Sequence, residues 1–441
     1  MRAGVDSAPV DVDVAVVGGG PTGSSAATTL ARLGRSVLVI DREVFPRFHI
    51  GESQLPWVNG ILEKLGAHEK VAQAGFVRKW GASFTTADGS ASQYADFSRA
   101  VEVPQPQTWQ VPRADFDHLL LEHARSQGAV VEHDCRAEDV AFDADGVTLT
   151  LRTPTGSRTV RAKAVVDASG RHGFLAKRFG TRVIDPILQN IAVHGQFTNV
   201  PRAEGRRAGD IRMVTRPDRG WFWFIPISPT VMSVGAVLPK AVYHASPRRS
   251  PEQALAAFIA QAPAAAALMA DARPASPARF EADFSYVHSQ LAGDRFVLAG
   301  DAAAFLDPIF STGVLLGMQA GIDAAEAIHA GLAAGDLSRA RFRDYEAGVV
   351  ARYQHFRRFV VGFYDPAFRD LFFQPGGPLG TYEAVLSVLG GNWKPSLGTR
   401  LRLALFLALV RLQRYVPLAP RLWSTPDAMA AADTPLADDA R

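Results

Sequence analysis

Five features that follow one another between residues 13 and 41 constrain the fold of this chain more than anything else in its sequence. Residues 13–17 (DVAVV) have the pattern of a short buried strand, and Gly18-Gly-Gly-Pro-Thr-Gly23 comes directly after them. Residues 24–34 carry alanine and leucine at helical spacing, and residues 36–40 form a second apolar run that ends at Asp41. This order of strand, glycine turn, helix, strand and acid predicts a βαβ unit of a Rossmann-type nucleotide fold.

The residues of this unit suit the binding of a dinucleotide. In such a turn the first glycine allows a tight bend, the second lets the pyrophosphate approach the backbone, and the third packs the helix against the strand. The start of the helix presents unpaired N–H groups to the phosphates, and an acid eighteen residues after the turn can accept hydrogen bonds from the adenosine ribose. A purely structural turn is the alternative. The residues that we predict to bind the cofactor here are Gly18, Gly20, Pro21, Gly23 and Asp41.

Length and charge argue against several other classes of protein. With 441 residues, the chain is longer than one hydrophobic core usually supports, so we expect more than one subdomain. The net charge is only +3 and no basic run occurs, which argues against a nucleic-acid partner. The eleven histidines show no metal-ligand spacing, and we therefore expect no bound metal.

Cysteine use and hydropathy favour a cytoplasmic protein. Cys135 is the single cysteine, which excludes an intramolecular disulfide and fits a reducing compartment. Residues 1–10 lack the apolar core of a secretory signal. The most apolar late stretch, residues 401–412, is short and contains Arg402 and Arg411, so we expect an amphipathic helix there and no membrane span.

Three further segments indicate which dinucleotide binds. Residues 111–117 (VPRADFD) open a helix, residues 167–171 (DASGR) follow a strand, and Gly300-Asp301 follows another strand. Together with the glycine turn they resemble the glutathione-reductase-type FAD fold that aromatic hydroxylases use. The resemblance implies that Asp301 holds the ribityl chain of a non-covalently bound FAD and that Arg113 lies against the cofactor. The alternative for Arg113 is a surface arginine at the start of a helix.

The source of reduced flavin stays open at this point. No second Gly-x-Gly-x-x-Gly pattern with a strand and a helix around it occurs, so the sequence shows no separate nicotinamide domain. Either NAD(P)H binds transiently to this chain, or a partner reductase delivers flavin that is already reduced.

Residues 219–226 (RGWFWFIP) contain the pattern Trp-x-Trp-x-Ile-Pro. One interpretation is that the alternate tryptophans merely share one face of a core strand. The pattern is accompanied, however, by residues 48–53 (FHIGES), 75–82 (GFVRKWGA) and 305–314 (FLDPIFSTGV). With these segments, the sequence over about residues 11–330 strongly resembles the flavin-dependent halogenases, and among them those of carrier-protein-bound pyrroles. The resemblance implies a position near the flavin for Trp221, Trp223, Ile225 and Pro226.

The resemblance also implies that Lys79 is catalytic. In this family, reduced FAD and O2 give a flavin hydroperoxide, a halide attacks it, and the resulting hypohalous acid must reach the substrate without escaping. An ammonium can hydrogen-bond this acid and a free amine can become a chloramine, which arginine forms less readily. A dry tunnel would lower the pKa of a lysine from about 10.4. Only seven of the 47 cationic residues are lysines, and the alternative is a surface lysine beside Arg78.

The same family pattern assigns the start of a later helix to the halide and the flavin. Backbone N–H groups of Thr312 and Gly313 would bind chloride, because amide pairs in a turn can form an anion site. Gly313 and Val314 would contact the cofactor. Close relatives often have Ser-Ser-Gly where this chain has Ser311-Thr-Gly, a change that keeps the hydroxyl and the backbone donors.

The sequence therefore predicts an FADH2-dependent halogenase that uses O2 and chloride or bromide on an electron-rich aromatic such as a pyrrole or a phenol. The aromatic would be free or tethered to an acyl or peptidyl carrier protein, in a pathway of secondary metabolism such as antibiotic biosynthesis. A separate flavin reductase is the expected partner. An FAD-dependent monooxygenase or dehydrogenase on the same fold and a non-catalytic flavin-binding protein are the alternatives. For His49 and Glu52, flavin orientation, a tunnel wall and a structural hydrogen bond all stay open.

The expected fold class is α/β: a Rossmann-type FAD-binding domain with an inserted β-sheet substrate domain and a C-terminal helical region. The FAD-binding domain would be discontinuous, because its motifs are spread over the first three quarters of the chain. We divide the sequence into FAD-binding segments 11–85, 111–185 and 286–335, substrate-side strands 86–110, a β-sheet substrate domain 186–285, a helical region 336–423 and a disordered tail 424–441.

Overall fold

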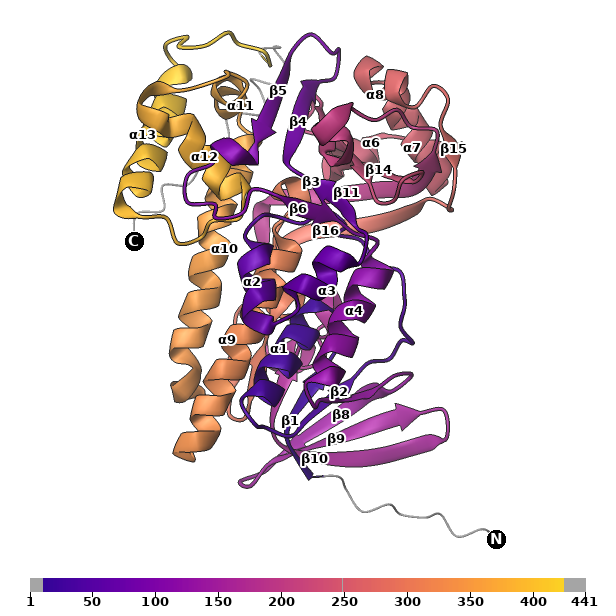
Figure 1. Ribbon diagram of the computed structural model, residues 1–441, viewed down its shortest axis with the longest axis vertical. Helices are drawn as coiled ribbons and strands as arrows, with labels where there is room; N and C mark the ends of the chain where they lie inside the picture. Colours follow the sequence, from indigo (N-terminus) through magenta and orange to yellow (C-terminus); the bar gives the residue numbers. More distant parts are fainter. Residues whose placement is uncertain (1–10, 248, 424–441) are drawn as a thin grey trace.

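The computed structural model describes residues 11–247 and 249–423, and the tail expected at residues 424–441 lies outside the described residues. Figure 1 shows a lower half in which helices cover one sheet and an upper half in which a second sheet lies between two groups of helices. The chain passes between the two halves several times, which is why the motifs of one site are far apart in the sequence.

The first sheet is organised around β1 (Asp11–Val17), which pairs in parallel with β10 (Gly156–Asp167) and with β2 (Val37–Ile40). All four residues of β2 are buried, as expected for a parallel strand that is covered on both faces. α1 (Pro21–Arg32) packs against α4 (Arg113–Ser126) and α9 (Gly313–Ala334). This arrangement confirms the predicted Rossmann-type fold. The other strands of the sheet are β7 (Val130–Glu132), β8 (Arg136–Phe142), β9 (Val147–Thr153), β17 (Ala292–Gly293) and β18 (Phe296–Leu298).

The second sheet has the strand order β19-β16-β11-β14-β13-β12-β4-β5, with β15 paired to β11. Every residue of its strand β13 (Trp221–Pro226) is buried, because the two faces of this strand enter different cores. Trp221 and Trp223 contact the core shared with the C-terminal helices, and Phe222 contacts the core shared with α7 (Pro251–Ala260). The remaining strands are β4 (Gly81–Thr86), β5 (Ser92–Asp96), β11 (Arg182–Thr198), β12 (Ile211–Thr215), β14 (Met232–Pro239), β15 (Arg273–Pro274), β16 (Arg279–His288) and β19 (Ala304–Phe305).

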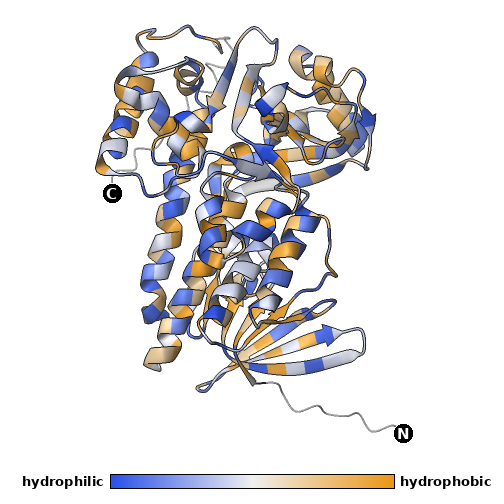
Figure 2. Ribbon diagram, viewed as in Figure 1, coloured by the Kyte–Doolittle hydropathy of each residue, from blue (hydrophilic) through white to orange (hydrophobic). Residues whose placement is uncertain are grey.

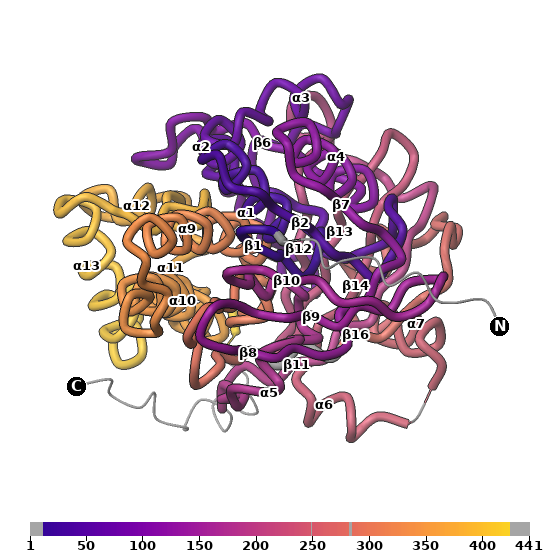
Figure 3. Tube along the Cα trace, turned by 90° about the horizontal axis from the view of Figure 1, so that it is seen from below, coloured from indigo at the N-terminus to yellow at the C-terminus, as the bar shows by residue number. Residues whose placement is uncertain are grey.

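The C-terminal residues form helices, as predicted. α10 (Arg343–Phe363) lies beside α9 and leads into α11 (Pro366–Phe372), α12 (Thr381–Leu389) and α13 (Leu397–Gln413). Viewed from below, α11–α13 gather on the side of the molecule opposite α7 (Figure 3). They are held to the second sheet by aromatic rings, since the Phe84 ring of β4 packs edge-on against Phe372 at 4.9 Å between centroids.

A short ribbon of two strands, β3 (Val77–Lys79) and β6 (Thr108–Gln110), is separate from both sheets. It carries Lys79 opposite Thr108. Among the described residues, no helix has the length and apolar character needed to cross a bilayer. The remaining helices are α2 (Val58–Leu65), α3 (His68–Gln73), α5 (Ala176–Phe179), α6 (Lys240–Ala245) and α8 (Pro263–Leu268).

Candidate active site

The glycine turn after β1 has no room for side chains at two of its three glycines. Gly18 has φ +107°, and a Cβ placed on it would lie 2.3 Å from the carbonyl oxygen of Ala168. A Cβ on Gly23 would lie 1.8 Å from the carbonyl oxygen of Gly18. Gly20 faces more open space, and Pro21 is the first residue of α1. The turn therefore has the close packing and the exposed helix start that a pyrophosphate requires.

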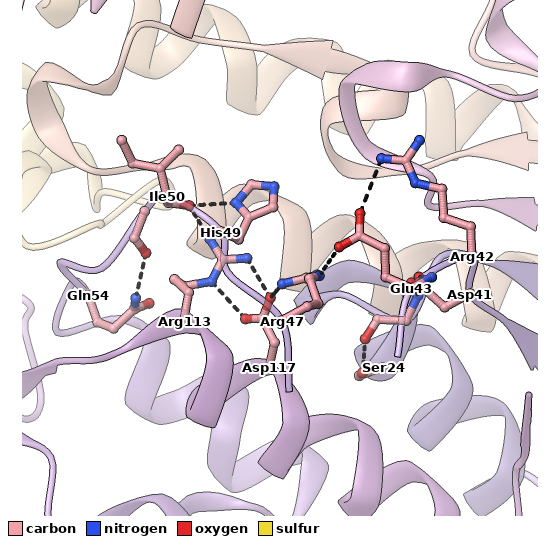
Figure 4. A network of polar contacts seen from close by, with 12 residues as sticks. Ser24, Asp41, Arg42, Glu43, Arg47, His49, Ile50, Gln54, Arg113 and Asp117 are labelled. Carbon is pink, nitrogen blue, oxygen red and sulfur yellow. Dashed lines mark hydrogen bonds and ion pairs between the residues drawn. The ribbon is translucent and has the colours of Figure 1, made fainter. Parts of the chain in front are cut away.

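Asp41 ties this turn to the end of β2. One carboxylate oxygen accepts a hydrogen bond from the amide of Gly19 at 2.7 Å, and the other accepts one from the amide of Glu43 at 2.8 Å. Each carboxylate oxygen has a second lone pair, which leaves capacity for a ribose hydroxyl. Figure 4 shows Asp41 in this position, beside Ser24 of α1.

Arg113 belongs to a buried ion-pair cluster at the start of α4 (Figure 4). It donates to both carboxylate oxygens of Asp117, at 2.7 and 2.9 Å, and to the carbonyl oxygen of Ile50 at 2.6 Å. Arg47 donates to the same carboxylate at 2.6 Å. Burial would raise the pKa of Asp117, but the charges and hydrogen bonds of Arg113 and Arg47 outweigh it and lower that pKa. Arg113 is thus a fixed cation at the wall of the site.

The start of α9 offers free backbone donors. Ser311 has φ +56° and Thr312 is fully buried, while Gly313 is the exposed first residue of the helix. The N–H groups of a first helical turn have no partner inside the helix and carry the positive end of its dipole. They can therefore bind an anion. Gly313 also lines a cleft with Gly300 and Asp301.

Asp301 lies at the bend after β18, in the cleft that Gly313 lines. Desolvation raises the pKa of this carboxyl, and the nearby Arg171 and Arg113 guanidinium groups oppose the shift. Its carboxylate lines this cleft and can accept a hydrogen bond from a hydroxyl group there. The crowded glycine turn, the two carboxylates of Asp41 and Asp301 and the free α9 amides together fit the phosphate, sugar and ring portions of FAD.

Lys79 lies in a different, almost dry environment. Its side chain is 2% exposed, and Nζ donates to Ser53 Oγ at 2.8 Å and to the carbonyl oxygen of Gln54 at 2.9 Å. Burial lowers the pKa of Lys79 to about 7, and the more distant Asp210 opposes the shift. Asp210 is itself engaged by the amides of residues 80 and 81 at 2.6 and 2.9 Å. Within the described part of the chain, Lys79 forms no ion pair.

One extended segment, residues 50–55, brings these separate groups together. The carbonyl oxygen of Ile50 binds Arg113, and a Cβ on Gly51 would lie 3.9 Å from the Val314 side chain of α9. Ser53 and Gln54 hold Lys79. The segment therefore contacts the cofactor wall, the start of α9 and the lysine within five residues, and we call it the connecting segment.

Glu52 of the connecting segment reaches the tryptophan motif. Its carboxyl is hydrogen-bonded by the Ser233 side chain, and Ser233 Oγ accepts a hydrogen bond from Trp223 Nε1 at 3.2 Å. Burial raises the pKa of Glu52 to about 7. Its second carboxylate oxygen has no partner among the described residues. His49, the other residue whose role was open, is exposed, and its Nδ1 lies 2.7 Å from the carbonyl oxygen of its neighbour Ile50.

The other tryptophan joins the motif to the C-terminal helices. Trp221 Nε1 donates to the hydroxyl of Tyr364 at 2.9 Å, and this hydroxyl bonds both carboxylate oxygens of Asp307, at 2.9 and 3.1 Å. Asn190 donates to the same carboxylate at 2.6 Å. The motif 219–226 is thus both a core strand and a contact between three distant segments; Ile225 and Pro226 are buried at its end.

The structure adds further side chains to the predicted site residues, among them Glu52, Ser53, Ser233, Asp307 and Tyr364. A signal existed for three of them, since Glu52, Ser53 and Asp307 lie inside segments 48–53 and 305–314 that carry the family resemblance. Ser233 and Tyr364 had none. A polar residue that is hydrogen-bonded only through tertiary contacts carries no periodicity or spacing that a sequence could show.

Comparisons with known proteins agree with this geometry. Residues 11–358 match the family described as FAD binding domain. Over 382 residues the chain is 35% identical to the 1H-pyrrole-2-carbonyl peptidyl-carrier-protein chlorinase of Pseudomonas fluorescens, which covers 80% of this chain and 84% of that protein. The chain belongs to the flavin-dependent halogenases. Like them, this halogenase is an oxidoreductase that uses FADH2, O2 and a halide.

Solved structures extend the similarity to most of the halogenase. A triple mutant of the flavin-dependent brominase Bmp2 superimposes with a TM-score of 0.80 at 30% identity, covering 91% of this chain and all of that one. A flavoprotein/dehydrogenase from Cytophaga hutchinsonii gives a TM-score of 0.84 at 29% identity, covering 92% and 99%. Among the described residues of the halogenase, no group of three or more His, Cys, Asp or Glu side chains could hold a metal ion.

Proposed function

We propose that this halogenase transfers an oxidised halogen to an electron-rich aromatic ring, a pyrrole or a phenol, through Lys79. The observation that carries the proposal is the pairing of a dry lysine with the exposed start of α9 through one short segment of chain. Lys79 is buried against neutral oxygen acceptors, and Gly51 of the same connecting segment lies near Val314 in the first turn of α9, since a Cβ placed on Gly51 would be 3.9 Å from the Val314 side chain.

The residues would divide the reaction between two places. FAD, when bound and reduced, would supply electrons that activate O2, and O2 would be the oxidant that turns a halide into hypohalous acid. The amides of Thr312 and Gly313 would hold the halide at the cofactor side, where a helix start favours negative charge. Lys79 would hydrogen-bond the hypohalous acid at the substrate side. The ring carbon then forms a bond to the halogen, and the displaced hydroxide leaves as water with the proton that the ring loses.

A lysine with a pKa of about 7 suits this role in both of its protonation states. The ammonium form donates a hydrogen bond that polarises the oxygen–halogen bond. The amine form can take the halogen as a haloamine, releasing water. Because the environment holds the two forms close in energy near neutral pH, the same side chain supports either route. The roles of Asp41, Arg113 and Asp301 would be to hold the adenosine, ring and ribityl parts of FAD.

The names of relatives support a tethered substrate and a separate electron source. The Pseudomonas relative acts on a pyrrole-2-carbonyl group carried by a peptidyl-carrier protein, and we infer the same class of substrate here. FADH2 would come from a separate flavin reductase, since the sequence contains no second glycine-rich βαβ unit for a nicotinamide nucleotide. A cytoplasmic location fits both partners and the free, buried Cys135.

The test is aerobic turnover with FAD, NADH, a separate flavin reductase and chloride or bromide. An oxidant-sensitive halogenation probe traps free hypohalous acid, and a pyrrole-2-carbonyl thioester is the ring substrate. Wild type should give halide-dependent trapping and halogenated substrate. Lys79→Ala should give the trapping but not the halogenated substrate, while Lys70→Ala, which removes an exposed lysine, should behave as wild type.

The opposite outcome is equally specific. If oxygen is consumed without any halide-dependent product, and NADH reduces the bound flavin directly, the chain is a monooxygenase or dehydrogenase on this fold. If Lys79→Ala halogenates the substrate as fast as wild type, the lysine has no catalytic role.

A further inference from the structure

The last 40 described residues carry basic side chains and no acidic ones. Residues 384–423 contain six lysine and arginine residues and no aspartate or glutamate. Arg414 is paired with Asp365 of the preceding region, whereas Lys394, Arg400, Arg402 and Arg411 form no ion pair with any residue that the structure describes. An excess of one charge sign over a contiguous surface attracts partners of the opposite sign.

The same surface exposes large apolar side chains along α13. Leu397 is 74% exposed and Leu401 is 64% exposed, and Tyr415 just beyond the helix is 81% exposed. Leu397, Leu401 and Leu412 follow one another at spacings that keep them near one face of the helix. Figure 2 shows hydrophobic and hydrophilic bands side by side along α13. Exposed apolar residues that are grouped and bordered by charges are typical of a protein-binding surface.

A pocket of about 320 Å³ lies between α13 and α10 at this surface. Its walls combine apolar side chains with His355, and two exposed arginines, Arg358 and Arg400, are among its lining residues. Arg358 forms no ion pair within the described residues, and Arg400 uses only Nε, which donates to a backbone carbonyl at 3.0 Å. Trp393 also lines the pocket, and its buried Nε1 has no hydrogen-bond partner in the described chain. An unpaired buried N–H is costly unless a ligand or water accepts it.

The floor of the pocket adjoins the connecting segment. The Trp393 ring lies 4.8 Å from the Trp57 ring, and the amide of Trp57 donates to the carbonyl oxygen of Gly390 at 3.0 Å. A Cβ on Gly391 would lie 3.4 Å from Leu55 Cβ. Leu55 follows Gln54, whose carbonyl oxygen binds Lys79. The pocket is therefore separated from the lysine by only a few packed residues.

We propose that α13 and this pocket dock an acidic carrier protein, with the phosphodiester of its phosphopantetheine arm between Arg358 and Arg400. The proposal rests on the proposed function, in which the aromatic ring arrives as a carrier-bound thioester. Arginine is suited to this phosphate because its planar fork donates two parallel hydrogen bonds. The indole N–H of Trp393 would donate to an amide carbonyl of the arm, and Leu397 and Leu401 would pack against a helix of the carrier.

The pocket favours a carrier protein over an anionic membrane. A lipid surface would need only the exposed leucines and the spread cations of α13. It would not account for a partly apolar pocket with two arginines among its lining residues and an indole N–H that has no partner in the described chain. A flexible phosphodiester arm with amide groups matches all three features. Its far end carries the aromatic ring, which must reach Lys79.

The experiment measures binding and turnover in the full-length protein loaded with FAD. The probes are an acidic peptidyl carrier protein in its apo form, the same carrier charged with pyrrole-2-carbonyl on phosphopantetheine, and the N-acetylcysteamine thioester of pyrrole-2-carboxylate, which lacks the phosphate. Fluorescence anisotropy gives Kd for the carrier, and halogenation gives KM and kcat. The pocket variant combines Arg358→Glu with Arg400→Glu. The control variant combines Arg341→Glu with Arg343→Glu, the same charge change at two exposed arginines just before and at the start of α10.

In wild type the charged carrier should bind more tightly than the apo carrier. The pocket variant should weaken binding of the charged carrier about tenfold to a hundredfold, because two charge-assisted hydrogen bonds to phosphate are replaced by repulsion. Its kcat on the small thioester should match wild type, and the control variant should bind as wild type. Trp393→Phe, which keeps the ring and removes the N–H, should weaken the charged carrier but not the apo carrier.

The remaining outcomes separate docking from function. If wild type halogenates the charged carrier and the pocket variant does so with unchanged KM, the docking site is wrong and the proposed function stands. If wild type binds the charged carrier and the pocket variant does not, docking stands even where no halogenation occurs. The docking proposal is overturned if the full-length wild type binds vesicles of phosphatidylglycerol through α13 and has no affinity for either carrier. It is also overturned if wild type halogenates the small thioester but neither binds nor halogenates the charged carrier.

Discussion

Two buried cations lie at opposite ends of the connecting segment, and they are held in contrasting ways. Arg113 is 7% exposed and Lys79 is 2% exposed, so both have lost most of their contact with water. Arg113 binds the Asp117 carboxylate through two hydrogen bonds. Lys79 binds a hydroxyl and a backbone carbonyl, both of them neutral. The nearest carboxylate that influences it, Asp210, is already bonded to two amides and to Tyr94.

The difference shows how one fold provides both a permanent charge and a variable one. A guanidinium that forms a bidentate pair keeps its charge at any pH at which the protein is folded. An amine that is buried among neutral acceptors loses the solvation of its charged form without gaining an opposite charge, so its pKa falls. The first arrangement suits a wall that holds an anionic cofactor. The second suits a group that must gain and lose protons.

The strongest way to break this contrast is to remove the partner of Arg113. Asp117→Ala leaves the buried Arg113 guanidinium without its carboxylate partner, and leaves Arg47 with only Glu43, at 3.9 Å. We expect the free energy of unfolding of the apoprotein to fall by about 3–5 kcal/mol, the usual cost of breaking a buried ion pair on one side. Urea unfolding followed by circular dichroism measures it.

The matched control removes an acid that pairs with arginine at the surface. Glu138 binds Arg152 at 3.0 Å with both side chains exposed, and Glu138→Ala should cost about 0–1 kcal/mol. If Asp117→Ala costs no more than this control, solvent reaches Arg113 in the apoprotein and the pair is not what fixes the cation.

Lys79→Met should raise the free energy of unfolding at low pH, which is the opposite of the effect expected for Asp117→Ala. The folded pKa of Lys79 is lowered from its ordinary value of 10.5 to about 7, so between these values the unfolded chain binds more protons than the folded one. Stability of wild type should therefore rise with pH across this window, by up to about 1.4 kcal/mol per pH unit from this group. Below pH about 7 the charged lysine carries its full desolvation cost, and Lys79→Met should be more stable than wild type.

The measurement is the difference in unfolding free energy between Lys79→Met and wild type at several pH values from 6 to 10. Glu52, with a pKa of about 7, titrates in both proteins and largely cancels in the difference. The increase in unfolding free energy of Lys79→Met over wild type should be greatest at pH 6 and should shrink as pH approaches 10. A difference that does not change with pH would mean that Lys79 keeps its ordinary pKa, and the contrast with Arg113 would disappear.

The cofactor side was predictable from the sequence to a much greater extent than the lysine side. The phosphate turn is local in its sequence order, because the strand, Gly18, Gly23 and the helix follow one another and this order alone predicts the βαβ unit. Of its two crowded glycines, Gly23 is closed off by Gly18 of the same turn, whereas Gly18 is closed off by Ala168 from a distant strand end. The Arg113–Asp117 pair was also readable, because residues four apart on a helix face each other. The spacing was present in the 111–117 segment, although no role was predicted for Asp117.

The environment of Lys79 could not be predicted in this way. The acceptors of Lys79 lie 26 and 25 residues before it in the chain. The Tyr364 hydroxyl that binds Trp221 lies 143 residues after Trp221. These contacts depend on the packing of the ribbon, the second sheet and the C-terminal helices. Family resemblance pointed to Lys79, but its hydrogen-bond partners and the unpaired oxygen of Glu52 depend on burial, which only the folded structure reveals.

The smallest expected effect distinguishes the ammonium form of Lys79 from its amine form as the one that acts on the halogen. Ser53→Ala removes one neutral acceptor, and we expect only about 1 kcal/mol of lost stability, since a single hydrogen bond is involved. The loss should lower the lysine pKa by a further ~1 unit or less, because the hydroxyl favours the ammonium form. Ser92→Ala, which removes an exposed hydroxyl on β5, is the control.

If the ammonium is the active form, the alkaline limb of kcat for halogenation should move to lower pH in Ser53→Ala. If the amine accepts the halogen, the acidic limb should move to lower pH instead, and activity at pH 6 should rise above that of wild type. A profile that matches the Ser92→Ala control on both limbs would show that Ser53 does not set the proton affinity of Lys79.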